Sequence, residues 1–266
     1  MDGNRRFAKT HNLSIERGHR LGGSALEKVL GACYLAGVKI LTVYAFSTEN
    51  FQRPRAQVDA IMHLLREQIA RCSAPGGLAE QLGVAIRVLG RLDLLDDETR
   101  GAVMKAVDTT RGGNRLILNL CVAYSSRDEM TRAVRRSVEE YSHPRSPSHP
   151  ETALTAQSLS DKMYTADNPP VDILVRSSGV YRLSDFLLWQ CHQATHIQFL
   201  DTLWPDFGAW ELFMVLLRWQ RMRATTGRSR AGDAQAMVSC YISPGVCVLL
   251  ALFSFFSAVS YYLAIV

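Results

Sequence analysis

Two long apolar runs constrain the fold more than any other feature of this sequence. Residues 38–46 read VKILTVYAF, and residues 116–124 read LILNLCVAY. Both runs are rich in β-branched and aromatic side chains, and neither shows the polar alternation of a half-exposed strand. We therefore expect two buried parallel strands, with shorter strands at 84–89, 171–175 and 197–200.

Segments with a helical spacing of apolar residues separate these strands. The expected helices cover 16–36, 54–72 and 93–110, begin again near Ser125, recur at 158–163 and end with an amphipathic helix that stops near Arg223. Alternating strands and helices predict an α/β fold, a single domain with a central, mostly parallel sheet flanked by helices. A chain of 266 residues with 47% apolar content is long enough to bury such a core.

Charge and cysteine usage narrow the class of protein. The net charge is only +5, and it is uneven, because arginines crowd residues 218–230 and no charged residue follows Asp233. This local asymmetry predicts no nucleic-acid partner. The six cysteines stand singly, without a CxxC pair, which is typical of reduced, buried thiols in a protein that faces the cytosol.

The first nine residues, MDGNRRFAK, combine groups that suit a magnesium-bound diphosphate. Asp2 offers a hard oxygen ligand to Mg²⁺, Gly3 lets backbone N–H groups approach an anion, and Arg5 and Arg6 offer forked donors to phosphate oxygens. The same string also fits an Asp-Gly turn followed by solvated arginines, so the motif alone leaves both interpretations open. A GxxxxGK[ST] phosphate loop is absent from the sequence, which disfavours a nucleotide-binding P-loop protein.

Polar residues also follow three of the expected strands. They are Ser47, Thr48, Glu49, Asn50, Phe51 and Arg53 after the first long strand, Ser125, Ser126 and Arg127 after the second, and Arg176, Ser177, Ser178, Gly179, Arg182 and Ser184 after 171–175. Ligands of open parallel sheets bind beyond the carboxyl ends of the strands. We therefore expect a second anion site clamped by Arg176, Arg182 and Ser184. Any one of these residues alone could equally be a solvated helix cap.

Five sequence blocks, taken in order, resemble a known family. They are MDGNRRFAK, Gly18-His19, YAFSTENFQRP at 44–54, DILVRSSGVYRLSDFLLWQ at 172–190 and LWPDF at 203–207. The blocks look like the signatures of the cis-prenyltransferases, in the eukaryotic and fungal dehydrodolichyl diphosphate synthase branch, and the likeness spans residues 1–223. It implies an enzyme that condenses isopentenyl diphosphate onto a farnesyl diphosphate primer, with Mg²⁺, to make long-chain polyprenyl diphosphate for dolichol and protein glycosylation.

The resemblance also implies a role for each matching position. Asp2 matches the magnesium ligand at the allylic diphosphate, and Asn50 matches the position that accepts the proton lost on condensation. The positions implied to bind substrate are Gly3, Asn4, Arg5, Arg6, Phe7, His19, Ser47, Thr48, Glu49, Phe51, Arg53, Arg176, Arg182, Leu183 and Ser184. The growing chain needs an apolar channel, which helix 57–70 and strand 116–122 could line, although plain core packing explains the same side chains.

Four departures from the family pattern stand out. The central first strand that usually precedes the MDGNRR motif is missing, which implies a chain that folds poorly or an incomplete gene model. Val180 stands where many bacterial relatives have glutamate, and a second magnesium-binding glutamate would fall near Thr195 or His196. The chain also lacks the terminal Arg-X-Gly motif, which a homologous accessory subunit supplies in eukaryotic relatives; a homodimer is the other possibility.

The uncharged C-terminal region predicts a membrane anchor. We expect a catalytic domain at 1–223, a basic and polar linker at 224–245, and a membrane-spanning helix at 246–266. A buried core helix is the alternative. Because arginines precede the apolar run, the positive-inside rule places the catalytic domain in the cytosol, and the resemblance places the protein at the endoplasmic reticulum membrane.

Two classes of function remain after this reasoning. The first is an active cis-prenyltransferase. The second is a catalytically impaired or non-catalytic subunit of the same complex. Retention of Asp2, Asn50, Arg176, Arg182 and Ser184 favours the enzyme, because accessory subunits usually lose the first motif.

Overall fold

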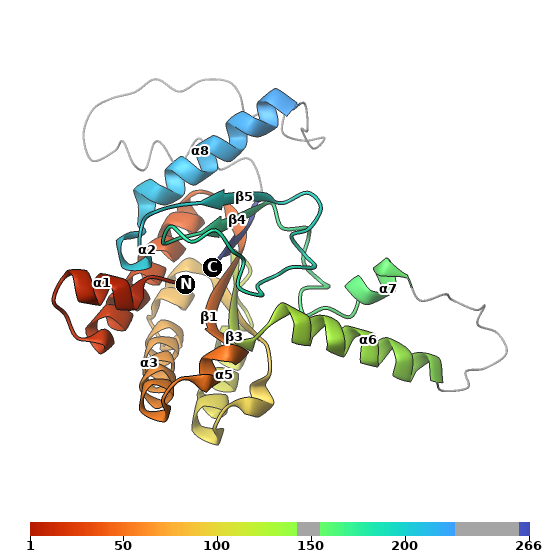
Figure 1. Ribbon diagram of the computed structural model, residues 1–266, viewed down its shortest axis with the longest axis horizontal. Coiled ribbons are helices and arrows are strands. Elements are labelled where there is room, and N and C mark those ends of the chain that lie inside the picture. The colour runs from red at the N-terminus through yellow and green to blue at the C-terminus, as the bar shows by residue number, and fades with distance from the viewer. Residues whose placement is uncertain (143–154, 227–260) are drawn as a thin grey trace.

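A parallel β-sheet forms the centre of the protein (Figure 1). The computed structural model describes residues 1–142, 155–226 and 261–266. Within them the strands are β1 Val38–Ser47, β2 Val84–Leu89, β3 Leu116–Tyr124, β4 Ile173–Arg176, β5 His196–Phe199 and β6 Tyr261–Ile265. They form a six-stranded sheet in the order β2-β3-β1-β6-β4-β5, and every neighbouring pair is parallel. The predicted α/β class is confirmed.

Helices alternate with these strands as the sequence predicted. The described helices are α1 Asn4–Thr10, α2 Ile15–Leu35, α3 Arg55–Ser73, α4 Leu78–Leu82, α5 Asp97–Thr110, α6 Ser126–Ser142, α7 Ala156–Ser160 and α8 Ala209–Thr226, with short 3-10 turns η1 Thr48–Gln52, η2 Leu92–Leu94 and η3 Trp204–Asp206. The predicted start of α5 at residue 93 is four residues early. Asp96 caps the helix by accepting the N–H of Thr99, and the preceding residues form η2 instead.

The two faces of the sheet are covered differently. Apolar residues of α2, α3, α5 and α8 form the larger core against one face. The other face packs against the loop after β4, where Phe186, Leu187 and Cys191 are buried. The start of α6 joins this loop, since the N–H of Ser126 donates to the carbonyl of Asp185 at 2.8 Å. The loop is therefore fixed to the sheet at the end where β1, β3 and β4 finish.

The expected membrane helix at 246–266 is wrong for its last residues. Residues 261–265 form β6, which lies between β1 and β4. Tyr261, Leu263 and Ile265 face one core, and Tyr262 and Ala264 face the other. A central parallel strand is apolar on both faces, so composition alone does not distinguish it from a buried or membrane helix. Residues 246–260, like the predicted loop at 143–154, lie outside the described residues.

β6 occupies a central position in the sheet, between β1 and β4. In the part of the chain that the structure describes, no helix has the length and apolar character needed to cross a membrane.

Trp204 packs against α2, and its substitution tests the packing of the core. Its ring is fully buried, and its Nε1 donates to the carbonyl of Gly22 on α2 at 2.8 Å. We expect Trp204→Ala to lower the free energy of unfolding by about 3–5 kcal/mol, because it opens a cavity and removes the partner of a buried carbonyl. Trp210→Ala is the control, since that ring is 58% exposed and its loss should cost less than about 1 kcal/mol. Equal losses of unfolding free energy in the two variants, measured by urea denaturation, would contradict this packing.

Candidate active site

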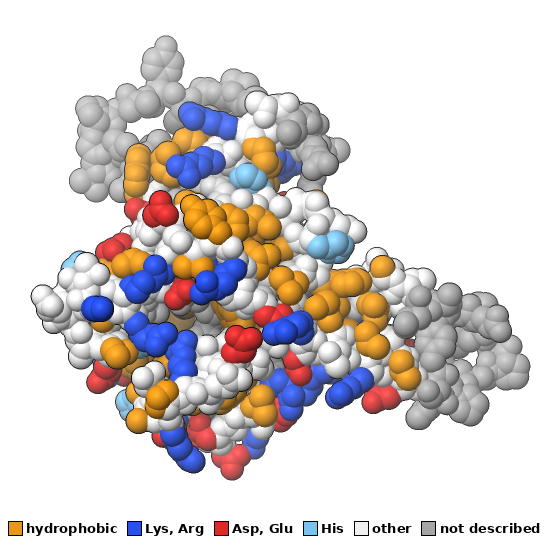
Figure 2. Space-filling model, in the orientation of Figure 1, with side chains coloured by type: hydrophobic (Ala, Val, Ile, Leu, Met, Phe, Trp, Pro, Cys, Tyr) orange, Lys and Arg blue, Asp and Glu red, His pale blue; other side chains and the backbone are white. Residues whose placement is uncertain are grey.

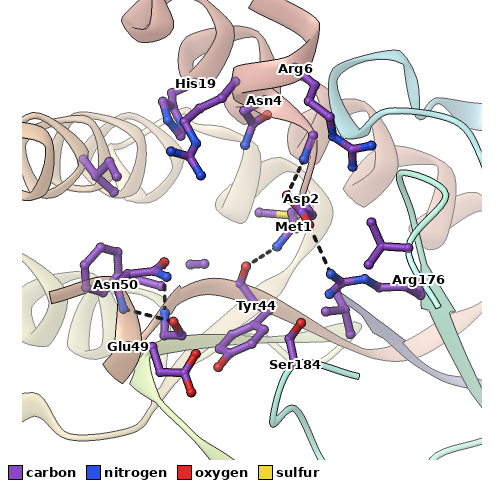
Figure 3. Close-up of a pocket in the computed structure, with 18 of the residues that line it drawn as sticks. Met1, Asp2, Asn4, Arg6, His19, Tyr44, Glu49, Asn50, Arg176 and Ser184 are labelled. Carbon is purple, nitrogen blue, oxygen red and sulfur yellow. Dashed lines mark hydrogen bonds and ion pairs between the residues drawn. The ribbon is translucent and has the colours of Figure 1, made fainter. Parts of the chain in front are cut away.

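A cavity of about 500 Å³ lies at the carboxyl ends of β1, β4 and β6 (Figure 3). Its lining consists of Met1, Asp2, Gly3, Asn4, Arg5, Arg6, His19, Tyr44, Ala45, Phe46, Ser47, Glu49, Asn50, Arg53, Ile61, Arg176, Val180, Arg182, Ser184 and Val266. The N-terminal motif, the segment after β1 and the loop after β4 thus meet in one place. Figure 3 shows Asp2 between Asn4 and His19 on one side and Asn50 and Tyr44 on the other.

Asp2 is tied to the end of β4 through both its side chain and its backbone. Its Oδ2 accepts from Nη2 of Arg176 at 3.1 Å, and its Oδ1 accepts from the N–H of Gly3 at 2.8 Å. Its carbonyl accepts from Oγ of Ser178 at 2.6 Å. The Asp2 side chain keeps 44% of its surface exposed, so it can still bind a ligand in the cavity.

Gly3 is required by the close approach of this loop to β4. Its φ of 102° lies in the region that favours glycine. A Cβ at this position would also lie 2.4 Å from Oγ of Ser178. Gly3 directly precedes α1, so the first turn of that helix starts at the cavity.

The site keeps Asp2 ionised. Burial alone would raise the pKa of this carboxyl, but the N–H of Gly3, then Arg176, the terminal amino group and Arg6, outweigh burial and hold the pKa below its usual range. Burial lowers the pKa of Arg176, while Asp2 raises it and Arg182 and Arg6 lower it, and an arginine remains charged under these conditions.

Positive charge dominates the cavity. Five guanidinium groups line it, those of Arg5, Arg6, Arg53, Arg176 and Arg182, against the two carboxylates of Asp2 and Glu49. In Figure 2, Lys and Arg side chains gather around the place where Figure 1 marks the two termini. Nε of Arg176 and Oδ1 of Asn4 are buried and have no hydrogen-bond partner among the described residues. The unpartnered N–H of Arg176, with the excess of guanidiniums, suits an anionic ligand, whereas the Asn4 oxygen needs a hydrogen-bond donor or a cation.

Asn50 and Ser47 form the turn that follows β1. Oγ of Ser47 accepts from the N–H of Asn50 at 3.2 Å, and Oδ1 of Asn50 accepts from the N–H of Ser47 at 3.4 Å. This reciprocal pair is a capping box, and it fixes both side chains at the cavity wall. Glu49, in the same turn, accepts from Nη2 of Arg127 at 3.3 Å.

Four residues that the resemblance implied to bind substrate do not line the cavity. They are Phe7, Thr48, Phe51 and Leu183. Phe7 is buried and stacks on His11 with ring centroids 4.1 Å apart, and Phe51 packs edge-on against Phe46 at 4.9 Å. Leu183 packs against the core on the other face of the sheet. These residues support the loops that carry the polar groups rather than facing a ligand.

The cavity also includes residues that the sequence reasoning missed. Tyr44, Ala45 and Phe46 end β1, so the strand-end argument applied to Ser47 could have found them. Val266 and Met1 gave no such signal, because their place depends on how the two ends of the chain fold.

A second, apolar cavity of about 140 Å³ adjoins the first. The two share Met1, Asn4, His19, Ala45 and Ile61. Its walls come from α3, β2 and β3, including the predicted helix 57–70 and strand 116–122, and from α2, which the sequence reasoning did not include. The further lining residues are Gly22, Gly23, Leu26, Glu27, Leu30, Leu64, Leu65, Gln68, Ile69, Cys72, Ile86, Leu118, Leu120 and Trp204. A cavity lined by arginines therefore adjoins an apolar one.

The donor set fits a magnesium ion shared with a ligand. Within residues 1–142, 155–226 and 261–266, no group of three or more His, Cys, Asp or Glu side chains could hold a metal ion without other ligands. Mg²⁺ commonly binds one or two carboxylates and completes its shell with water and substrate phosphates. Asp2, ionised and partly exposed beside the guanidiniums, matches that pattern. Thr195 donates to the carbonyl of Val171 and His196 begins β5, and neither lines the cavity.

The fold and this site define a parallel α/β protein with an arginine-rich cavity at the carboxyl ends of its strands. The family profile described as "Putative undecaprenyl diphosphate synthase" matches residues 1–227. The chain belongs to this family, the cis-prenyltransferases, which are prenyl-transferring enzymes.

Individual relatives agree with the family assignment. A dehydrodolichyl diphosphate synthase complex subunit of Schizosaccharomyces pombe is 36% identical over 225 residues, covering 83% of this chain and 82% of the relative. A human dehydrodolichyl diphosphate synthase complex subunit is 38% identical over 234 residues, covering 86% of this chain and 68% of the relative. Among solved structures, lavandulyl diphosphate synthase of Lavandula x intermedia, crystallised with dimethylallyl diphosphate, shares the fold with a TM-score of 0.73 at 24% identity, covering 83% of this chain and 92% of the other.

His19 provides a test of the electrostatics of the cavity. Burial, then the charges of Arg53 and Arg5, lower the pKa of His19 from 6.5 to about 4. The unfolded chain therefore binds a proton between pH 6.5 and 4 that the folded chain does not, so stability present above pH 6.5 falls as the pH drops toward 4. We expect His19→Gln to remove this part of the decline, which is at most about 1.4 kcal/mol per pH unit.

Urea denaturation of both proteins between pH 7 and pH 4.5 measures the effect. If the unfolding free energies of the wild type and of His19→Gln decline in parallel as the pH falls, the result would contradict a neutral His19. Inorganic pyrophosphate should raise the pKa of His19 in an NMR titration, because the anion offsets the charges of Arg53 and Arg5.

Proposed function

We propose that this chain condenses isopentenyl diphosphate onto an allylic diphosphate primer, farnesyl diphosphate, to make long-chain polyprenyl diphosphate for dolichol synthesis. The observation that carries the proposal is that Asp2 and the pair Arg182 and Ser184 line the same cavity. The names of the fungal and human relatives, as subunits of a dehydrodolichyl diphosphate synthase complex, support this choice of product.

We assign one diphosphate to each end of the cavity. The allylic diphosphate lies against Asp2, Gly3 and Arg5, with His19 beside it. Isopentenyl diphosphate lies against Arg182 and Ser184. Arg176 stands between the two, because it pairs with Asp2 and the charge of Arg182 helps to lower the pKa of Arg176. Two separate anchors hold the reacting carbons together, which is the main requirement of a transfer that needs few strong bases.

The reaction makes one carbon–carbon bond and breaks one carbon–oxygen bond. The allylic C–O bond breaks, and diphosphate leaves with the bonding electron pair. The double bond of isopentenyl diphosphate then attacks the allylic carbon, and one proton passes from the isopentenyl unit to an oxygen of the released diphosphate. We assign Asn50 to contact that proton, since it lies at the cavity wall opposite Asp2. The guanidiniums and backbone N–H groups stabilise the negative charge that grows on the leaving group.

Mg²⁺ would be held by Asp2 together with diphosphate oxygens. When bound, it would neutralise charge on the leaving diphosphate. The adjoining apolar cavity between α2, α3 and the sheet would take the hydrocarbon part of the allylic substrate, away from water.

We also propose a homologous accessory subunit as the partner, with a homodimer as the alternative. The names of the fungal and human relatives, which describe complex subunits, support this proposal. A location at the cytosolic face of the endoplasmic reticulum membrane stays a prediction from the family resemblance. A non-catalytic role is less well supported, because Asp2 is kept ionised and exposed to the cavity.

Asp2→Ala tests the role of the N-terminal carboxylate. We expect it to lose at least about a hundredfold of the rate of isopentenyl incorporation with farnesyl diphosphate and Mg²⁺, because stabilisation of the leaving group is lost. Asp108→Ala is the matched control, since Asp108 is exposed on α5 and lies outside the cavity lining. The assay is run with and without the candidate accessory subunit. Near-normal turnover by a folded Asp2→Ala protein would refute the assignment.

Arg5→Gln and Arg182→Gln test the separation of the two diphosphate anchors. Each removes one charge-assisted contact, so we expect roughly a tenfold or greater rise in one KM. Arg5→Gln should raise the KM for farnesyl diphosphate, and Arg182→Gln should raise the KM for isopentenyl diphosphate. If both substitutions raise the same KM, the cavity does not hold the two substrates as assigned.

A further inference from the structure

Three residues in the loop after β4 adopt a backbone conformation that is rare outside glycine. The φ angles are 50° at Ser184, 59° at Asp185 and 47° at Leu187. Ser184 lines the arginine-rich cavity, whereas Phe186 and Leu187 are fully buried in the core. The chain therefore turns at these residues from the cavity into the core, and such a turn persists only where the surrounding contacts hold it.

The start of α6 supplies these contacts. The N–H of Ser126 donates to the carbonyl of Asp185 at 2.8 Å, and the N–H of Arg127 donates to Oδ1 of Asp185 at 3.0 Å. The first N–H groups of a helix have no partner within the helix, so Asp185 satisfies two of them at once. On the other side of the turn, the N–H of Leu188 donates to Oγ of Ser126 at 3.0 Å.

The Asp185 carboxylate also pairs with the side chain of Arg127. Its Oδ2 accepts from Nε of Arg127 at 2.9 Å, and Nη2 of Arg127 donates to Oε1 of Glu49 at 3.3 Å. The side chains of Arg127 and Glu49 are 70% and 66% exposed, so the ion pair between them contributes little. The Asp185 side chain keeps only 11% of its surface exposed. The bonds to Asp185 are therefore the ones that fix the turn.

The place of the turn in the cavity wall determines where Ser184 points. Phe186 stacks on Tyr44 with ring centroids 4.8 Å apart, and Tyr44 lines the cavity. Figure 3 shows Ser184 next to Tyr44 at this wall. Asp185 does not line the cavity, so it can act on a ligand only through its neighbours.

We propose that Asp185 is a positioning residue for isopentenyl diphosphate. By capping α6 it holds Ser184, and Arg182 two residues before Ser184, where both can bind that diphosphate. This role rests on the proposed function, in which the anion at Arg182 and Ser184 is isopentenyl diphosphate. The alternative is a helix cap that only stabilises the fold.

Two substitutions of Asp185 separate the effect of its carboxylate from that of its backbone conformation. Asp185→Gly removes the carboxylate at a φ that glycine adopts without strain, and Asp185→Asn keeps an Oδ1 acceptor and tolerates the same φ. We expect Asp185→Gly to bind isopentenyl diphosphate at least about tenfold more weakly, because the charge-assisted bond to α6 is lost. Asp185→Asn should stay within about threefold of the wild type, because the N–H of Arg127 keeps its acceptor.

Titration calorimetry measures these affinities without turnover. The protein is first saturated with Mg²⁺ and an unreactive thiolo analogue of farnesyl diphosphate, so that isopentenyl diphosphate has only its own anchor to fill. In steady-state assays, Asp185→Gly should raise the KM for isopentenyl diphosphate and leave the KM for farnesyl diphosphate within about twofold of the wild type, because only the loop after β4 is released.

Asp96→Gly is the matched control. Oδ1 of Asp96 accepts from the N–H of Thr99 at 2.8 Å and caps α5, and Asp96 lines neither cavity. Both glycine variants should lower the midpoint of urea denaturation. Asp96→Gly should nevertheless keep its affinity for isopentenyl diphosphate within about twofold of the wild type, because it shares no partner with the loop after β4.

The proposal is overturned if a folded Asp185→Gly protein binds isopentenyl diphosphate normally, if Asp96→Gly loses as much affinity, or if Asp185→Asn is as weak as Asp185→Gly. If Asp185→Gly does not fold, Ser126→Ala removes the acceptor of the Leu188 N–H instead, and an unchanged affinity in that variant would also overturn the proposal. Because the allylic analogue does not react, a wild type that transfers no prenyl group would refute the proposed function while the ratios of affinity still decide the role of Asp185.

Discussion

The attachment of Asp2 to the end of β4 is the interaction on which the site depends. One residue bonds Arg176 with its side chain and Ser178 with its carbonyl, and the N–H of Trp204 donates to that same carbonyl at 3.3 Å. These contacts bring the first residues of the chain to residues more than 170 positions away. Without them the N-terminal arginines and the loop after β4 would not share a cavity.

Positive charge is concentrated around this attachment, and the mutual repulsion of the guanidinium groups is a cost that a bound anion would reduce. Five guanidiniums face two carboxylates, and their repulsion is part of what keeps His19 neutral. Arg176 is buried with one nitrogen unpartnered. A bound diphosphate would relieve these costs, and on the proposed function stability and substrate binding would then be coupled in the same group of residues. The strained conformations of Ser178 and Ser184 in the loop after β4 occur at the same place.

Much of this arrangement could be predicted from sequence because it follows local rules. The apolar runs that became β1 and β3 and the helical spacing of α2 and α3 are properties of short windows. The rule that ligands bind at strand ends then brought Asn50, Arg182 and Ser184 to one edge of the sheet. It could not separate Phe51, which turns into the core, from Ser47, which faces the cavity, because both lie in one turn.

The C-terminal strand could not be predicted in this way. An uncharged terminal run satisfies the requirements of a membrane helix and of a fully buried strand alike. Only the position between β1 and β4 in the folded sheet favours the strand over the helix. That position is defined by pairing between distant segments. The register of Ile265 with Val43 is therefore visible only in the folded chain.

The most direct test of the central claim is a crystal structure of the protein with Mg²⁺, isopentenyl diphosphate and an unreactive thiolo analogue of farnesyl diphosphate. We predict one diphosphate against Asp2 and Arg5 and the other against Arg182 and Ser184, in the same cavity, with the farnesyl chain between α2 and α3. Diphosphates bound on separate surfaces, or neither contacting the N-terminal loop, would contradict the account.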